Sequence, residues 1–218
     1  MILINFKIYQ ETFGDKAIEL AKSIKEITAG SKTEIVITAS ALDAYRLKEA
    51  TGLPIWLQNV DQYDQGKHTG WISSSQALAL GIDGSLINHS EHQITKGTAQ
   101  KIIKNKPENF KIVCCAKSIG QIKTWVAKAK PDYILYEPPE LIASSTDSVA
   151  SKPESIKKAL EACASVPLLV GAGIKSPEDV EVCLKMGVKS IGLSSALVLN
   201  KDPGKLLKEL VAVFNAII

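Results

Sequence analysis

The sequence predicts an α/β fold: a single-domain (β/α)8 barrel over residues 1–218, in which eight parallel strands close on themselves inside a ring of helices. Three observations predict it. Short runs rich in Ile, Val and Leu recur along the chain, amphipathic helical segments separate them, and a chain of 218 residues that is 45% hydrophobic can bury one large core. Closure of such a sheet leaves no open edge.

The predicted strands carry apolar residues at consecutive positions, as parallel strands covered on both faces do. Right-handed crossovers through the intervening helices would place successive strands side by side. In chain order the strands are Ile2–Asn5, Glu34–Thr38, Ile55–Gln58, Ser85–Asn88, Lys111–Cys115, Asp132–Tyr136, Pro167–Gly171 and Ser190–Leu193.

The segments between the strands show helical spacing of apolar residues, and several begin with helix-start signals. Ser118 followed by Gln121, and Ser151 followed by Glu154, have the spacing of capping boxes, while Ser176-Pro177 places proline at a first helical position. The clearest predicted helices are Asp15–Thr28, Ser118–Lys128, Ser155–Ala164 and Pro203–Phe214.

An open, doubly wound sheet is the main alternative fold. Such a sheet usually binds a nucleotide through a glycine-rich turn after its first strand, whereas this chain has Asn5-Phe6-Lys7-Ile8-Tyr9 at that point. The sequence contains neither GxGxxG nor GxxxxGK, so the barrel is favoured.

Charge and hydropathy narrow the possible partners. The net charge is +3, and lysines and glutamates are scattered along helical segments, which argues against a nucleic-acid partner. No apolar stretch approaches the ~20 residues of a membrane span, and Met1 leads directly into the first strand without a signal sequence. We therefore expect a cytoplasmic protein that binds neither nucleic acid nor membrane.

The four cysteines, Cys114, Cys115, Cys163 and Cys183, show no CxxC spacing. A dense disulfide pattern is also missing, so we expect reduced, structural thiols.

Polar residues just beyond the apolar runs are the candidates for function, because barrels of this kind build their sites at the carboxyl ends of the strands. An ammonium, an imidazole and a carboxylate, from Lys7, His89 and Glu137, would meet there although they lie far apart in the sequence. The other candidates at strand ends are Asn5, Gly173, Ser194 and Ser195.

An ordered set of segments carries a family resemblance. They are Asn5 to Lys7, Gly66 to Gly70, Asn88 to Glu91, Tyr136 to Ile142, Gly171 to Ile174 with Glu178 to Val180, and Gly192 to Ser195. The set resembles the triosephosphate isomerases, specifically their short archaeal-type branch, over nearly the whole chain. The resemblance implies a TIM barrel that interconverts dihydroxyacetone phosphate and D-glyceraldehyde 3-phosphate through an enediol(ate), in glycolysis and gluconeogenesis, without a cofactor or metal.

The resemblance also implies a role for each candidate. Glu137 would move a proton between adjacent carbons while neutral His89, at what the sequence suggests is a helix start, donates to the carbonyl oxygen; this family is itself the standard example of that pairing. Lys7 would supply a fixed positive charge, and Asn5 would orient its neighbours. Glu91 would contact these residues without touching the substrate.

The phosphate would be held by backbone N–H groups of three loops, as the resemblance implies. These are the loop that begins near Ile142, the turn containing Gly173, and the Ser194-Ser195 segment. Glycine turns and helix starts suit an anion because their N–H groups are free to donate.

Two departures from the family pattern stand out. The loop after Ile142 is the family's lid, and it has Ala143-Ser144-Ser145 where glycines are usual, which would strain closure if positive φ angles are needed there. His92-Gln93 replaces residues that are commonly basic, so an ion pair that supports the loop after the fourth strand would be lost.

The segment Asp61 to Gly70 and Trp71 form a long loop that, in this family, reaches into a neighbouring subunit, so the resemblance implies a homodimer or homotetramer. Two other functions remain open from the residues. The altered lid suggests a non-catalytic or weakly active sugar-phosphate-binding barrel. Another phosphate-binding barrel enzyme, such as an isomerase of amino-acid biosynthesis, would not be expected to combine this lysine, histidine and glutamate.

Overall fold

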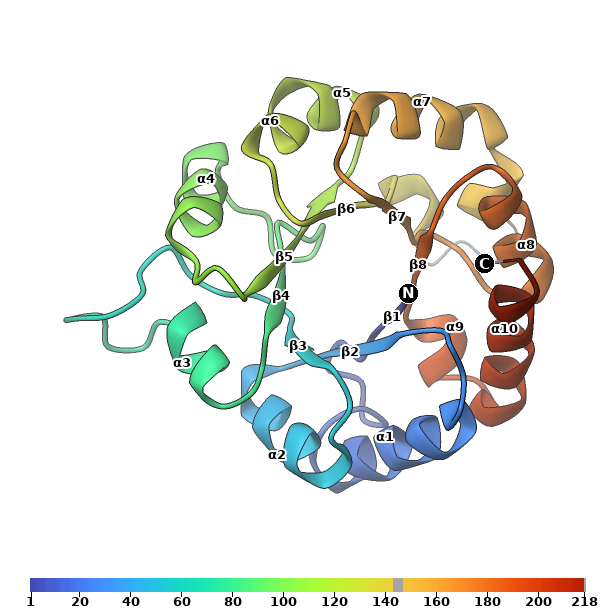
Figure 1. The fold of residues 1–218 in the computed structure, drawn as a ribbon, viewed down its shortest axis with the longest axis horizontal. Helices are drawn as coiled ribbons and strands as arrows, with labels where there is room; N and C mark the ends of the chain where they lie inside the picture. Colours follow the sequence, from blue (N-terminus) through green and yellow to red (C-terminus); the bar gives the residue numbers. More distant parts are fainter. Residues whose placement is uncertain (143–146, 218) are drawn as a thin grey trace.

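A computed structural model describes residues 1–142 and 147–217, and it confirms the predicted (β/α)8 barrel as a single domain. Parallel strands pair in chain order, and β8 pairs with β1 to close the ring, with the helices outside it (Figure 1). The strands are β1 Ile2–Asn5, β2 Ile35–Ala39, β3 Ile55–Leu57, β4 Gly84–Ile87, β5 Lys111–Ala116, β6 Tyr133–Tyr136, β7 Leu168–Val170 and β8 Ser190–Leu193. Each lies within two residues of its predicted bounds.

The strands divide their apolar side chains between two cores. One set faces the helices, and alternate residues fill the barrel interior because side chains along a strand point to opposite faces. The interior cluster is Leu3, Val36, Trp56, Leu86, Val113, Cys115, Leu135 and Leu169. The strands are therefore fixed on both sides, and the positions of their carboxyl ends are well determined.

The helices surround the barrel, and α10 packs beside both α1 and α8. They are α1 Gly14–Thr28, α2 Ala41–Thr51, α3 Ser74–Ala79, α4 Lys96–Asn105, α5 Ile119–Gln121, α6 Ala127–Ala129, α7 Pro153–Cys163, α8 Pro177–Lys185, α9 Ser195–Val198 and α10 Pro203–Ile217. A π-helical stretch, Ile122–Val126, joins α5 to α6, so the predicted helix Ser118–Lys128 is continuous but irregular.

Two of the three predicted helix starts are confirmed. The Ser118 hydroxyl accepts from the N–H of Gln121, and the Ser176 hydroxyl accepts from the N–H of Asp179 with Pro177 at the first helical position. The capping box at Ser151 is wrong. Ser151 ends a 3-10 turn in which its hydroxyl donates to the Ser148 carbonyl, and helix α7 begins at Pro153 with no side-chain cap.

All four cysteines are free and buried, so the expectation of reduced thiols is confirmed. Burial raises the pKa of the Cys114 and Cys183 thiols to about 12, and Asp179 adds to the shift at Cys183. Among the described residues, no helix combines the length and apolar character needed to cross a bilayer.

Gly84 at the start of β4 is expected to be required for stability. A Cβ atom there would lie 2.5 Å from the Trp56 ring. The ring cannot easily move away because its Nε1 donates a hydrogen bond of 3.0 Å to Asp83 Oδ1. Gly84→Ala should therefore lower the unfolding free energy by about 1–3 kcal/mol, as overpacking does. Urea denaturation measures this, with Gly97→Ala in α4 as the control, because a Cβ there meets only the Thr95 hydroxyl at 3.8 Å. Equal stability of the two variants would contradict the prediction.

Candidate active site

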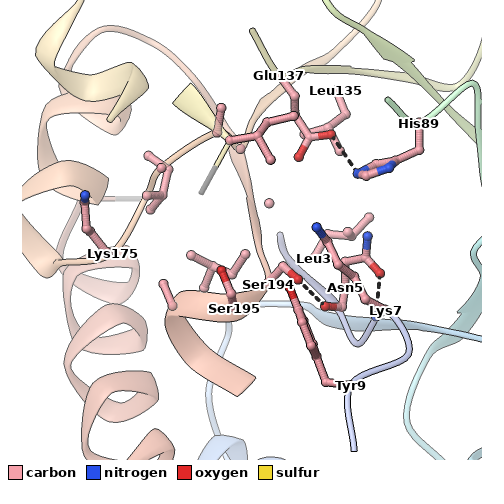
Figure 2. A pocket seen from close by; sticks show the side chains of 18 of the residues that line it. Leu3, Asn5, Lys7, Tyr9, His89, Leu135, Glu137, Lys175, Ser194 and Ser195 are labelled. Carbon is pink, nitrogen blue, oxygen red and sulfur yellow. Dashed lines mark hydrogen bonds and ion pairs between the residues drawn. The ribbon is translucent and has the colours of Figure 1, made fainter. Parts of the chain in front are cut away.

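A cavity of about 380 Å³ opens at the carboxyl ends of the strands (Figure 2). Segments that follow β1, β4, β6, β7 and β8 contribute to its wall, so residues distant in sequence meet around one space. Its lining includes the predicted residues Asn5, Lys7, His89, Glu137, Ile142, Gly173, Ser194 and Ser195. Of the predicted site residues only Glu91 does not line this cavity, and it contacts two that do.

Lys7 is held in an uncommon backbone conformation directly after β1. Its φ is 51°, which is costly for a residue other than glycine. Two side chains hold this conformation: Asn5 Oδ1 accepts from the Lys7 N–H at 3.0 Å, and Gln58 Nε2 donates to the Lys7 carbonyl at 2.9 Å. The ammonium forms an ion pair with Glu91 Oε1 at 2.6 Å. Asn5 and Glu91 thus fix the backbone and the charge of Lys7 respectively.

His89 lies at the end of β4 in a turn, which corrects the expectation of a helix start. The turn is closed by the His92 N–H donating to the His89 carbonyl, and α4 begins only at Lys96, where Thr95 is the cap. His89 therefore does not lie in the first turn of α4. Instead the Glu91 N–H donates to His89 Nδ1 at 3.2 Å, so the proton of the neutral ring resides on Nε2, which faces the cavity.

Glu137 follows β6 and lies beside His89 on the cavity wall, with its Oε2 3.3 Å from His89 Nε2 (Figure 2). This Oε2 atom is buried and has no hydrogen bond of good geometry within the described residues, since the contact with His89 is close but poorly aligned. Burial raises the pKa of the Glu137 carboxyl, His89 and Lys7 oppose the shift, and Glu91 adds to it. A buried carboxylate with an uncommitted oxygen is suited to accept a proton from a substrate.

Gly171 makes room for the Glu137 side chain. A Cβ atom at Gly171 would lie 2.8 Å from Glu137 Oε1 and 3.2 Å from its Cγ. The absence of a side chain at this residue therefore allows the carboxylate to occupy its observed position.

Another part of the wall is formed by main chain and small side chains. Gly173 has φ +75°, and a Cβ there would meet the Asp147 carbonyl at 2.6 Å and Ser148 Cα at 2.9 Å, so only glycine fits. Ser194 donates its hydroxyl to the Asn5 carbonyl at 2.8 Å, and Ser195 begins α9. The main-chain N–H groups at a helix start have no intrahelical acceptor and can bind an anion.

Ala143, Ser144 and Ser145, where the resemblance implies a lid, lie outside the described residues. Ile142, the last described residue before them, lines the cavity. At the other departure from the family pattern, Gln93 accepts from Lys117 Nζ at 3.2 Å and its amide donates to the Ser90 carbonyl at 3.4 Å. A hydrogen-bonded glutamine thus links the loop after β4 to the loop after β5.

Several residues that line the cavity were not among those predicted from the sequence. The most polar of them are Tyr9, Lys175 and Asn200. Tyr9 lies two residues beyond Lys7, and Lys175 lies two beyond Gly173, so proximity to a predicted residue was an available signal. Among the described residues, no group of three or more His, Cys, Asp and Glu side chains is arranged to hold a metal ion.

Comparisons with known proteins agree with this geometry. A family model described as triosephosphate isomerase matches residues 1–212. The triosephosphate isomerase of Methanothermus fervidus is 33% identical over 216 residues, which cover 97% of each chain. That of Saccharolobus solfataricus is 35% identical over 215 residues, covering 97% of this chain and 94% of the relative. That of Metallosphaera sedula is 34% identical over the same length, with the same coverage of both chains.

Proposed function

Since the chain belongs to the triosephosphate isomerase family, we propose that it interconverts dihydroxyacetone phosphate and D-glyceraldehyde 3-phosphate, using Lys7, His89 and Glu137. The observation that supports these roles most strongly is the convergence of the three side chains on one cavity at the carboxyl ends of the strands. The activity places the enzyme in glycolysis and gluconeogenesis.

The reaction moves one proton from carbon to carbon and one from oxygen to oxygen, and it relocates the carbonyl double bond through an enediol(ate). Starting from the aldehyde, the Glu137 carboxylate takes the proton from the carbon beside the carbonyl, and the freed electron pair forms a carbon–carbon double bond. Negative charge then develops on the carbonyl oxygen, where His89 Nε2–H donates a hydrogen bond. The protonated Glu137 returns its proton to the neighbouring carbon as the ketone forms. In the same step the hydroxyl proton of the second carbon passes, through His89, to the oxygen of the former aldehyde.

Lys7 would act through its fixed charge. Its ammonium lies beside the cavity and is positioned by Glu91 at 2.6 Å, so little reorganisation is needed when charge develops on the enediolate. The substrate phosphate would bind to main-chain N–H groups at the turn containing Gly173 and at the Ser194-Ser195 segment, with Ile142 packing beside it.

The composition of residues 143–145 suggested the alternative of a non-catalytic binder, and no feature of the described residues favours it. The experiment that separates the two is a coupled assay with D-glyceraldehyde 3-phosphate as substrate. Turnover by the unmodified chain supports the isomerase, whereas tight binding of inorganic phosphate without turnover would support the alternative. A barrel isomerase of amino-acid biosynthesis is disfavoured by the names of the relatives.

Self-association is part of the proposal. The segment between β3 and α3 extends away from the barrel (Figure 1), and it carries Tyr63 stacked on His68, with Trp71 edge-on to Tyr63 at 5.0 Å. Trp71 is 47% exposed. Aromatic side chains presented on a projecting loop are typical of a protein interface, so we propose a homodimer or homotetramer. We also propose that the protein is located in the cytoplasm.

Trp71→Glu is expected to reduce the mass of the particle toward that of a monomer, because a buried charge without a partner opposes association. Sedimentation equilibrium measures the mass. Val182→Glu on α8 is the matched control, since this residue is 39% exposed and α8 lies on the other side of the barrel from the projecting loop (Figure 1). An unchanged mass for Trp71→Glu would place the interface elsewhere or show that the chain is a monomer.

A further inference from the structure

Asn88 connects β4 to His89 in a left-handed conformation. Its φ is 58°, and its side chain is only 5% exposed. Residues with a Cβ atom rarely adopt this conformation, and asparagine tolerates it better than most. The chain thus bends immediately before His89, at a residue type suited to this backbone conformation.

The Asn88 side-chain amide forms hydrogen bonds through both its nitrogen and its oxygen. Main-chain pairing between β4 and β5 is last seen at Ile87 and Cys114, and beyond this point Asn88 Nδ2 donates to the Cys115 carbonyl at 2.9 Å. Asn88 Oδ1 accepts from the Ile94 N–H at 3.2 Å, which closes the loop that contains the histidine. The side chain therefore joins the beginning of this loop to its end and to the neighbouring strand.

His89 takes its position from this arrangement. The residue is 7% exposed, its Nδ1 accepts from the Glu91 N–H, and its Nε2 faces Glu137 at 3.3 Å. Both contacts depend on where the backbone of residues 88–94 lies. A shift of this loop would move Nε2 relative to the reacting carbonyl oxygen, and misplacement by about 1 Å can cost ~10²-fold in rate.

We infer that Asn88 is a positioning residue that sets the place of the His89 imidazole through its left-handed backbone and its two amide hydrogen bonds. The inference rests on the proposed catalytic role of His89. Asn88 itself does not line the substrate cavity, so substitutions there should lower kcat through His89 and leave the binding of the phosphate group almost unchanged.

Two variants separate the backbone from the amide. Asn88→Ala removes both hydrogen bonds and the tolerance for positive φ, and it is expected to lower kcat by about 10–10²-fold. Asn88→Gly removes the same hydrogen bonds but allows the left-handed conformation, so its loss of kcat should be smaller, about tenfold or less. Should Asn88→Ala fold poorly, Asn88→Gly carries the test.

The decisive measurement is a double-mutant cycle with His89→Gln in the full chain. The substitution at Asn88 should cost its full factor when His89 is present and less than about threefold when glutamine replaces it, because a residue that acts through His89 loses its effect without it. Inhibition by glycerol 3-phosphate, which has the phosphate but no carbonyl, should stay nearly constant across the series.

Three outcomes would overturn the inference. An equal loss in both backgrounds would show that Asn88 acts independently of His89, as a merely structural residue would. Unchanged kcat in Asn88→Ala would show that the loop needs neither feature. If His89→Gln itself had no effect on kcat, the proposed role of His89 would fail together with the inference, which distinguishes this case from the other two.

Discussion

Glu137→Gln is expected to lower kcat by about 10³-fold, because the substitution removes the base and leaves an amide of nearly the same shape. The KM for D-glyceraldehyde 3-phosphate should change much less, since the proposed phosphate site is built from main-chain N–H groups and not from Glu137. Steady-state kinetics in both directions measure these quantities. Retention of most of the turnover would show that another group removes the proton.

The stability of Glu137→Gln provides the control for folding. Burial raises the carboxyl pKa above its ordinary value of 4.5, so the folded state binds this proton more tightly than the unfolded chain does. At a pH above the raised pKa the buried charge therefore costs stability, and the cost disappears as the pH falls below 4.5. Glu137→Gln should accordingly have a higher Tm than the parent protein at neutral pH and lose this advantage in acid. An inactive variant with a lower Tm at neutral pH would instead indicate damage to the fold.

Lys7→Met is expected to lower kcat/KM by about 10²–10³-fold, because it removes a positioned charge and leaves a similar apolar stem. The substitution also leaves Glu91 without its partner, so an unpaired carboxylate faces the imidazole. Kinetics with D-glyceraldehyde 3-phosphate measure the loss, and added salt should not restore the activity.

Lys106→Met is the matched control for this variant. Its side chain is 14% exposed against 15% for Lys7, and it also pairs with a carboxylate, that of Asp132, but it lies between α4 and β5 at the other end of the barrel. Comparable losses in the two variants would mean that Lys7 contributes to the fold rather than to the chemistry.

The sequence predicted the architecture well because its signals are local. Apolar runs located all eight strands, and polar residues at their ends located the cavity, since parallel strands in a closed barrel bring those ends together. Lys7, His89 and Glu137 could be placed at one site on that basis alone, although nothing local in the sequence gives the distances between them.

What sequence reasoning missed depends on contacts between segments. The turn at His89 forms because the His92 N–H closes it and Asn88 adopts a positive φ, whereas the pattern after the strand resembled a helix start. At Ser151 the capping spacing was present, but the hydroxyl bonds to Ser148 and Pro153 begins the helix. The donation of the Glu91 N–H to His89 Nδ1 has no sequence signal, because it depends on the shape of the turn.

The central claim is that Glu137 moves a proton between adjacent carbons, and isomerisation in D₂O tests it most directly. A base that exchanges its proton with solvent should place deuterium on the hydroxymethyl carbon of dihydroxyacetone phosphate. NMR or mass spectrometry measures this incorporation. Incorporation by the parent protein, slowed in Glu137→Gln in proportion to kcat, is the result we predict. Rapid turnover by the parent protein with no deuterium at that carbon, together with equally rapid turnover by Glu137→Gln, would indicate direct hydride transfer and would contradict the claim.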